Sequence, residues 1–203
     1  MHPARSFAWT DRSEMLELVR RVSFCTICVA GADGVRVVHA PVVVEGPASL
    51  RFHVSRGNRA AASLDGARAL VSCLGPDAYV SPDWYGTADQ VPTWNYQSVE
   101  IEGPLRRLSN AELVDQLDAL SAEHEARLAP KPQWTRGKMS PGRFEAMTGA
   151  IVGYELSIEA MRGTNKLGQN KRLAERQGAV AGLRAAGEGK MAELMAASAE
   201  DAA

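Results

Sequence analysis

The sequence has few aromatic residues, few cysteines and no long apolar run. Three cysteines, an odd number, argue against a disulfide framework and favour a reducing compartment. The longest apolar run covers residues 22–30, far too short to span a bilayer, and charges spread over the first 21 residues leave no signal-peptide core. We therefore expect a soluble, cytoplasmic protein that makes no membrane contact.

The chain also has almost no net charge. Its 23 basic and 24 acidic residues give a formal net charge of −1, so it lacks the overall basic character that drives non-specific nucleic-acid binding. Hydrophobic residues make up 45% of the 203 positions and charged residues 23%. This balance excludes intrinsic disorder and collagen-like repeats and indicates an ordinary globular protein.

Short segments rich in β-branched residues, separated by turn formers, dominate the first half of the chain. Four segments show helical patterns: one after Asp11, one over residues 109–128, one over residues 140–148 and one after Lys171. The segment 109–128 begins with a capping box. Because helices do not alternate with the strands, the pattern predicts a mainly β fold, an antiparallel barrel with flanking helices. The expected strands are 23–30, 35–45, 49–55, 67–74, 94–108 and 150–159.

No established catalytic or metal-binding motif stands out. Cys25 and Cys28 have the spacing of a redox or zinc pair, but in a strand residues three apart point to opposite faces, so we interpret them as small buried residues. The histidines lack zinc-ligand spacing. With no nucleophile elbow, phosphate-binding loop or dinucleotide fingerprint, hydrolase, kinase and Rossmann dehydrogenase functions lack support.

Most of the tyrosine and tryptophan residues lie in one segment. Two prolines, Pro82 and Pro92, stiffen it, so its rings lose little entropy on binding. The segment suits a planar ligand or a protein interface, and equally an aromatic plug at one end of a barrel. The aromatic residues concerned are Tyr79, Trp84, Tyr85, Trp94 and Tyr96.

Two further segments carry groups that suit an anion. Ser55, Arg56 and Asn58 follow a predicted strand and offer donors for a phosphate, although Ser and Asn also serve commonly as caps of such turns. The segment 162–176 holds five basic residues against one acidic residue. It indicates an anion site, a nucleic-acid contact or simply a solvated helix start.

Taken in order, these segments resemble the PaiB family, over residues 3–184. The family consists of FMN-binding negative transcriptional regulators with the six-stranded flavin split-barrel fold, so the resemblance implies a homodimer with one flavin near each subunit boundary. The motifs that carry it are Phe24-Cys25-Thr26, His39-Ala40-Pro41, His53 with Arg56 and Asn58, Gly75-Pro76, Tyr79-Val80-Ser81-Pro82, Trp84-Tyr85, Val91-Pro92-Thr93-Trp94-Asn95-Tyr96, Ile151-Val152-Gly153 and Lys166-Leu167 with Gln169-Asn170.

The resemblance also implies a cofactor site, and the sequence itself indicates neither a metal site nor a side-chain catalyst. The strand at His39, Ala40 and Pro41 is expected against the isoalloxazine, and Ser55, Arg56 and Asn58 at the phosphate. The residues expected to close the site, from the same or the other subunit, are Trp94, Asn95, Tyr96, Lys166, Gln169 and Asn170; His53 and Tyr79 complete the cofactor-binding set.

We expect three parts along the chain. Residues 1–160 form the flavin-binding split barrel, including the inserted helices 109–128 and 140–148; residues 161–186 carry the basic motif and a helix packed on the barrel or the dimer partner; 187–203 are an Ala-rich flexible tail. The sequence departs from the family pattern at Thr164 and Gly168, where lysine and serine are usual, and its loop at 86–90 has no lysine.

Three functions follow as hypotheses. The first is an FMN-binding transcriptional regulator that contacts DNA, although the charge balance gives DNA binding little support. The second is an NAD(P)H-dependent FMN reductase, with NAD(P)H as a transient reductant, in which bound flavin needs no side-chain base. The third is a non-catalytic module for haem or another planar ligand.

Overall fold

The computed structural model describes residues 3–31 and 34–200. The chain forms two compact units, and each is built from several segments. Unit 1 consists of Met1–Asp11, Leu74–Val99 and Arg162–Ala203; unit 2 consists of Arg12–Cys73 and Glu100–Met161. The boundary predicted at 160 lies close to one junction between the units, but Leu74–Val99 belongs to unit 1 as well, which a linear division did not foresee.

Unit 2 is built around six strands that close on themselves. Its strands pair in the order β5-β2-β3-β4-β7-β6, and β6 is also hydrogen-bonded to β5, so the six form a ring. The predicted mainly antiparallel β fold with flanking helices is therefore confirmed. The strands are β2 (Phe24–Gly31), β3 (Gly34–Glu45), β4 (Ser49–Ser55), β7 (Ile151–Ser157) and the unit 2 parts of β5 (Arg68–Val80) and β6 (Thr93–Arg107).

Alternation along β2 and β3 separates a core side from an outer side. Cys25, Ile27 and Val29 are buried, whereas their neighbours in the sequence point to the other face. We call this other face of the two strands the outer face. It consists of Phe24, Thr26, Cys28 and Ala30 on β2, opposite Pro41, His39, Val37 and Val35 on β3.

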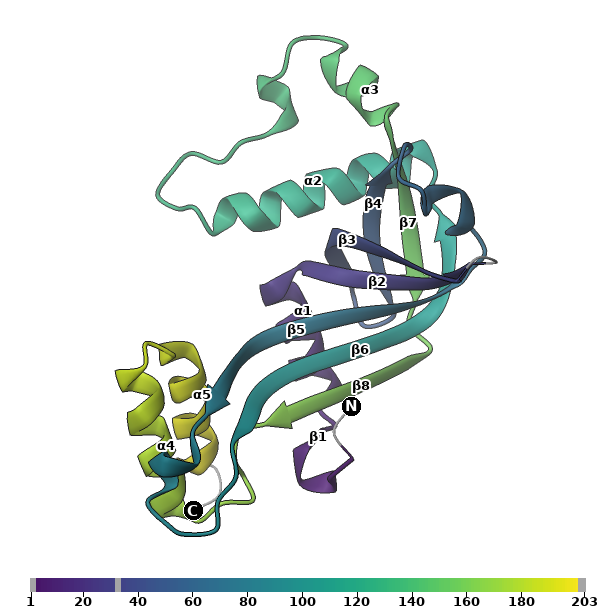
Figure 1. The fold of residues 1–203 in the computed structure, drawn as a ribbon. Coiled ribbons are helices and arrows are strands. Elements are labelled where there is room, and N and C mark those ends of the chain that lie inside the picture. Colours follow the sequence, from purple (N-terminus) through teal and green to yellow (C-terminus); the bar gives the residue numbers. More distant parts are fainter. Residues whose placement is uncertain (1–2, 32–33, 201–203) are drawn as a thin grey trace. The chain divides into compact units, whose positions relative to one another are not determined.

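The helices of unit 2 pack on this sheet as predicted, with changed ends. Helix α1 (Arg12–Val22) buries its apolar stripe, and α2 (Asn110–Ala126) starts at the predicted capping box, in which Glu112 N donates to Ser109 Oγ (3.3 Å) and Ser109 N to Glu112 Oε2 (2.8 Å). A long connection with a 3-10 turn (η4, Arg136–Lys138) leads to the short α3 (Arg143–Thr148) (Figure 1). A second 3-10 turn, η2 (Ala61–Ser63), follows β4.

Unit 1 contains two strands that the sequence did not predict. β1 (Ala8–Trp9) pairs antiparallel with β8 (Ala160–Lys166), with Ala8 opposite Thr164, and the strand order is β1-β8-β6-β5. The strand β8 escaped prediction because Gly163, Thr164 and Asn165 interrupt any apolar alternation. A 3-10 turn, η1 (Arg5–Phe7), precedes β1, and η3 (Pro82–Tyr85) follows β5.

A helical hairpin completes unit 1. Helix α4 (Leu173–Ala185) was expected, but residues from 187 onward were expected to fray; instead Gly189–Glu200 form α5. The reason is an apolar stripe in the Ala-rich segment: Met191, Ala192 and Met195 are buried against Leu183 and neighbouring residues of α4. None of the helices in the described residues is both long and apolar enough to cross a membrane.

Candidate functional site

The turn after β4 holds two cations, Arg56 and Arg59, and neither pairs with a carboxylate in the described part of the chain. Its polar side chains are engaged as caps, because Gly57 N donates to Ser55 Oγ (3.2 Å) and Ala60 N donates to Asn58 Oδ1 (2.9 Å). Arg56 differs from them: its Nε donates to the carbonyl oxygen of Gly149 at 2.7 Å. No carboxylate pairs with Arg56 in the described part of the chain, so its two terminal nitrogens keep their capacity to bind an anion.

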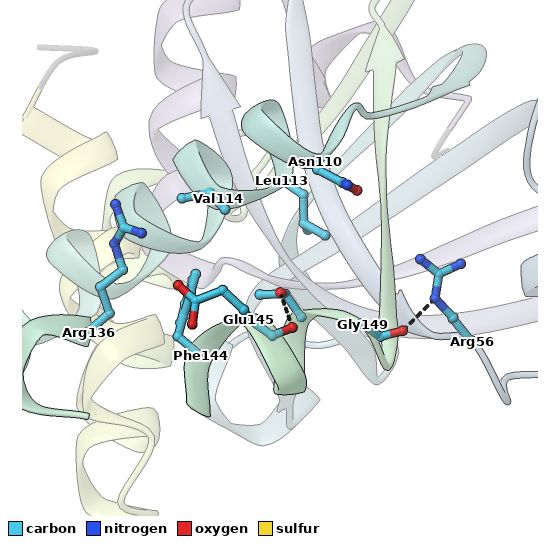
Figure 2. A pocket seen from close by; sticks show the side chains of 9 residues that line it. Arg56, Asn110, Leu113, Val114, Arg136, Phe144, Glu145 and Gly149 are labelled. Atoms are coloured by element: carbon cyan, nitrogen blue, oxygen red, sulfur yellow. Dashed lines mark hydrogen bonds between the residues drawn. The ribbon is translucent and has the colours of Figure 1, made fainter. Parts of the chain in front are cut away.

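A cavity of about 350 Å³ lies beside this turn, between α2 and α3 (Figure 2). Arg56 and Arg136 stand at opposite ends of the residues that line it. Arg136 is already committed, since its Nε lies 3.2 Å from Asp118 Oδ2 and its guanidinium lies over the Phe144 ring, 5.1 Å from the centroid. The remaining lining residues are Asn110, Leu113, Val114, Glu145, Thr148 and Gly149.

The predicted ring-binding strand divides its side chains between two faces. Ala40 is 2% exposed and points into the core, while His39 lies on the outer face and Pro41 is half-buried. Phe24 stacks near His39, with ring centroids 6.5 Å apart and planes 24° from parallel. Thr26 Oγ1 lies 3.2 Å from His39 Nδ1, which fixes the orientation of that ring. The outer face thus presents an aromatic surface that a flat ligand could cover.

His53 faces a helix. Its Nδ1 donates to Gln116 Oε1 (3.1 Å) on α2, because an amide oxygen can only accept. Burial lowers the pKa of His53, which keeps the imidazole neutral, although the bond to Gln116 opposes this shift. Its protein contact is therefore structural: it ties β4 to α2.

The aromatic segment of unit 1 serves two different purposes. Trp84 and Tyr85 face α4: a Cβ on Gly182 would lie 2.3 Å from the Trp84 indole, and one on Gly178 would lie 2.2 Å from the Trp84 carbonyl oxygen. Tyr79 and Trp94 are about half exposed and meet edge to face, with centroids 6.0 Å apart. Trp84 and Tyr85 therefore pack within unit 1 against α4, whereas Tyr79 and Trp94 remain exposed to a ligand or a partner.

The next residues of β6 point in opposite directions. Asn95 is 1% exposed; its Nδ2 donates to Met195 Sδ (3.2 Å), and its Oδ1 has no partner among the described residues. Tyr96 is half-buried. Gln97, which the sequence did not single out, is also buried and donates from Nε2 to Asn165 Oδ1 (3.1 Å). The amides of Asn95 and Gln97 therefore lie inside unit 1. In the sequence, only the alternation of inward-facing and outward-facing residues along β6 could have indicated their burial.

The predicted residues after β8 mostly brace their own loop. Gln169 accepts from Leu167 N (2.8 Å) and donates to the carbonyl oxygen of Asn165 (2.5 Å). Lys166 Nζ donates to Thr93 Oγ1 (2.5 Å), and partial burial lowers the pKa of this lysine. Asn170 is exposed. Lys166 and Asn170 retain surface that a ligand could reach, whereas Gln169 is a loop brace.

The two departures from the family pattern have structural explanations. Gly168 has φ of +76°, in the left-handed region that favours glycine, and a Cβ there would lie 3.4 Å from Met195 Cε. Thr164 is buried in β8, opposite Ala8, where a lysine ammonium would lose its hydration. Both positions are therefore fitted to the interior of unit 1.

Basic residues from 166 to 176 are occupied within unit 1. Lys171 Nζ donates to Gln90 Oε1 (2.5 Å) and lies 4.7 Å from the centroid of the Tyr85 ring. Arg172 pairs with Glu175 (2.8 Å). Arg176 is 5% exposed and donates to Ser198 Oγ (2.6 Å). These contacts attach the loop at 86–92 and helix α5 to α4, and they leave this segment little free charge for an anion.

A serine–histidine pair in unit 2 is structural. Ser23 Oγ donates to the carbonyl oxygen of Val42 (3.1 Å), so His124 Nε2, 3.0 Å away, must be the donor to Ser23. A histidine that donates to serine cannot act as its base, and Ser23 is 1% exposed. In the described residues no cluster of three or more His, Cys, Asp or Glu could hold a metal ion.

The predicted site residues therefore fall into two sets, each within its own unit. Unit 2 contributes His39, Ala40, Pro41, His53, Ser55, Arg56 and Asn58, and unit 1 contributes Tyr79, Trp94, Asn95, Tyr96, Lys166, Gln169 and Asn170. Of these, His39, Arg56, Tyr79 and Trp94 have both the exposure and the chemistry for a planar, phosphorylated ligand.

Solved structures share this fold at low sequence identity. The FAD and heme binding protein from Mycobacterium smegmatis aligns with a TM-score of 0.59 and 19% identity, covering 78% of this chain and 73% of that one. The flavocytochrome Anf3 from Azotobacter vinelandii aligns with a TM-score of 0.59 and 16% identity, covering 81% and 72%. These likenesses establish the fold.

Sequence comparison establishes the family. The protease synthase and sporulation protein PAI 2 of Bacillus subtilis (strain 168) is 28% identical over 175 residues, covering 84% of this chain and 83% of that protein. This relative agrees with the PaiB resemblance of the sequence motifs. Residues 1–160 match the model of a family described as "Putative FMN-binding domain". The chain belongs to this FMN-binding domain family.

Proposed function

We propose that the protein is an FMN-binding homodimer of the PaiB type, in which bound flavin controls a negative regulator of transcription. The observation that carries the proposal is Arg56, a guanidinium held in place by the carbonyl of Gly149 and free of any acidic partner in the described chain. Family membership and the PAI 2 relative support the same conclusion.

The phosphate of FMN is assigned to the terminal nitrogens of Arg56. A phosphate dianion accepts charge-assisted bonds from the planar guanidinium, and the cavity beside Arg56 gives it room. Ser55 and Asn58 contribute by holding the turn, since their side chains cap its backbone. The residues present therefore fit the anionic end of this cofactor.

The isoalloxazine ring is assigned to the outer face at His39. Phe24 and His39 provide stacked rings there, and Phe24 is 62% exposed in the single chain. Val35 and Val37 extend the same exposed apolar surface along β3, which suits a second copy of the chain. When bound, FMN supplies a two-electron redox centre; the protein's residues bind it, orient it and keep water from the ring.

Flavin binding is tested by comparing FMN with riboflavin, which lacks the phosphate. The absorption spectrum of the purified protein first distinguishes flavin bands from a haem Soret band. Titration should then show tighter binding of FMN than of riboflavin, and Arg56→Ala should remove that preference, whereas the neighbouring Arg59→Ala should keep it. An unchanged preference in Arg56→Ala would place the phosphate elsewhere.

The homodimer is tested through the exposed phenylalanine of the outer face. Phe24→Asp should convert a dimer to a monomer in light-scattering measurements, because a buried carboxylate at an apolar interface is costly. Val91→Asp is the control, since Val91 is 70% exposed and lies in unit 1, outside the outer face. A monomeric wild type, or a Phe24→Asp dimer, would contradict the assigned interface.

Regulation of transcription requires selective DNA binding. Labelled DNA titrated with the protein at several salt concentrations should form a sequence-selective complex, and this complex should weaken as the salt concentration rises. Binding should change when FMN is added to flavin-free protein. The absence of any complex at low salt would rule out direct repression.

An NAD(P)H-dependent flavin reductase is the second candidate. It is favoured because the cations of the basic segment already contact protein groups, which leaves little charge for DNA. These cations are Lys171, Arg172 and Arg176. Anaerobic mixing of the FMN-loaded protein with NADH or NADPH should bleach the flavin bands if this candidate is correct. An unchanged spectrum would exclude it.

A further inference from the structure

Two of the three cysteines face each other inside unit 2. Antiparallel β2 and β5 pair with Thr26 opposite Ser72, and the same register continued by one residue puts Cys25 opposite Cys73. Both side chains are buried, at 2% and 0% exposure. Directly opposed residues of antiparallel strands have Cα atoms about 4.5–5.5 Å apart, within the span that a disulfide bridges.

The surroundings of the two thiols differ. The neighbouring Cys73 and burial raise the pKa of Cys25, whereas the neighbouring Cys25 and the charge of Arg21 lower the pKa of Cys73 against the effect of its burial. Thiolate is the reactive form of cysteine. Cys73 is therefore suited to attack an oxidant, and Cys25 to resolve the product.

We propose that Cys25 and Cys73 form a thiol-oxidation site, at which a small hydroperoxide converts the pair to a cross-strand disulfide. The Cys73 thiolate attacks one oxygen of hydrogen peroxide, the O–O bond breaks, and the departing hydroxide takes up a proton to become water. The Cys25 sulfur then attacks the Cys73 sulfenic acid, the S–O bond breaks, and a second water leaves. One peroxide is reduced to two waters while two thiols become one disulfide.

The third cysteine provides an internal contrast. Cys28 lies on the outer face, opposite Val37 on β3 and Leu70 on β5, so it has no thiol across either pairing. It is more accessible than the buried pair. Accessibility alone would favour oxidation of Cys28, whereas strand register favours a bond between the two buried thiols. A disulfide between the buried thiols with Cys28 left reduced would therefore be a consequence of register. The step does not depend on bound flavin.

The experiment exposes the full-length protein to hydrogen peroxide and then alkylates the remaining thiols in denaturant. The native wild type should lose two hydrogens by mass and retain one alkylatable cysteine. Because Cys25 and Cys28 fall in one tryptic peptide, 22–36, the assignment is made in Cys28→Ser, which should form the disulfide at the wild-type rate and retain no free thiol. Cys25→Ser should accumulate Cys73 sulfenic acid, trapped by dimedone.

Denatured protein supplies the control for fold-directed pairing. In urea the short separation of Cys25 and Cys28 should make their disulfide prominent, whereas native protein should give the Cys25–Cys73 product alone. Oxidation of Cys28 with the other two thiols intact, or a Cys28-linked dimer as the main native product, would overturn the proposal. The number of remaining thiols and any Cys28-linked dimer are read from wild-type protein, and the assignment to Cys25 requires only that Cys28→Ser folds.

Discussion

Two basic segments looked alike in the sequence and differ in the structure. Arg56, after β4, contacts a backbone carbonyl and has no acidic partner in the described chain. In the segment that leads into α4, Lys171 contacts Gln90, Arg172 contacts Glu175, and Arg176 is buried against α5. The comparison teaches that a cation counts as a ligand-binding group only where the fold leaves its charge uncompensated. The larger basic cluster is structural, whereas Arg56 is available and lines the cavity beside its turn.

The largest expected effect tests the structural side of the comparison. Gly178→Ala should destabilise the protein by about 3 kcal/mol, because a Cβ would lie 2.2 Å from the backbone oxygen of Trp84 and that backbone would have to move. Urea unfolding measures the loss. Gly189→Ala is the matched control: nothing lies within 4 Å of its added Cβ, so its stability should change by less than about 1 kcal/mol. Equal effects of the two variants would contradict the packing of α4 on Trp84.

The next effect separates the two basic segments by ligand affinity. Arg56→Ala should weaken FMN binding by roughly 1.5–3 kcal/mol, the range for a lost hydrogen bond to a charged group. Lys171→Ala should leave FMN affinity within about twofold, because the ammonium contacts Gln90 and the Tyr85 ring. Isothermal titration of both variants checks the contrast. Comparable losses would mean that the basic segment also serves the cofactor.

A smaller effect is expected at the exposed aromatic pair. Trp94→Phe retains an aromatic ring beside Tyr79 and loses the bond from Trp94 Nε1 to Asp77 Oδ1 (2.8 Å). Because the pair is exposed, FMN affinity should fall by less than about 1 kcal/mol, well below the effect of Arg56→Ala. The same titration measures it. A larger loss than in Arg56→Ala would make the aromatic surface the principal cofactor contact.

Local pattern predicted the strands and capped helices well, and it failed where tertiary contacts decide. Alternation located β2, β3 and β4, and the capping box at Ser109 located α2. The strand β8 has no apolar alternation, and α5 depends on burial of Met191 and Met195 against α4, so neither was expected. For the site, residue types identified Arg56 as a hydrogen-bond donor for a phosphate. Only the structure distinguishes its guanidinium, which has no acidic partner in the described chain, from the cations of the basic segment that contact protein groups.

The same limit explains the cysteines. Spacing along β2 correctly separated Cys25 from Cys28, because strand periodicity is local: the structure buries Cys25 and places Cys28 on the outer face. It could not indicate that Cys73, 48 positions further along, lies opposite Cys25, because that contact depends on the register of β2 with β5. Pairing across strands is a property of the fold and leaves no mark in the spacing.

The smallest expected effect concerns the stability at acidic pH of the basic segment that leads into α4. Glu175 accepts bonds from Arg172 and from Thr87 Oγ1 (3.0 Å), and the Arg172 bonds lower the pKa of Glu175 to about 2. A carboxylate with a lowered pKa stabilises the folded state fully above its ordinary pKa, and this contribution is lost as the pH falls through about 2. Wild type should therefore melt higher than Glu175→Gln at pH 6, and the gap should close between pH 4.5 and 2.

Thermal melts of wild type and Glu175→Gln over this pH range measure the difference between their melting temperatures. Because both proteins contain all the other acids that titrate in this range, the difference isolates the contribution of Glu175. Glu193→Gln, at an exposed position on α5, is the matched charge control and should show no such pH-dependent gap. If the gap between wild type and Glu175→Gln stayed constant down to pH 2, the ion pair with Arg172 would contribute nothing to holding the loop at 86–92. The basic segment would then be more available to ligands than its contacts imply, and the distinction from Arg56 would weaken.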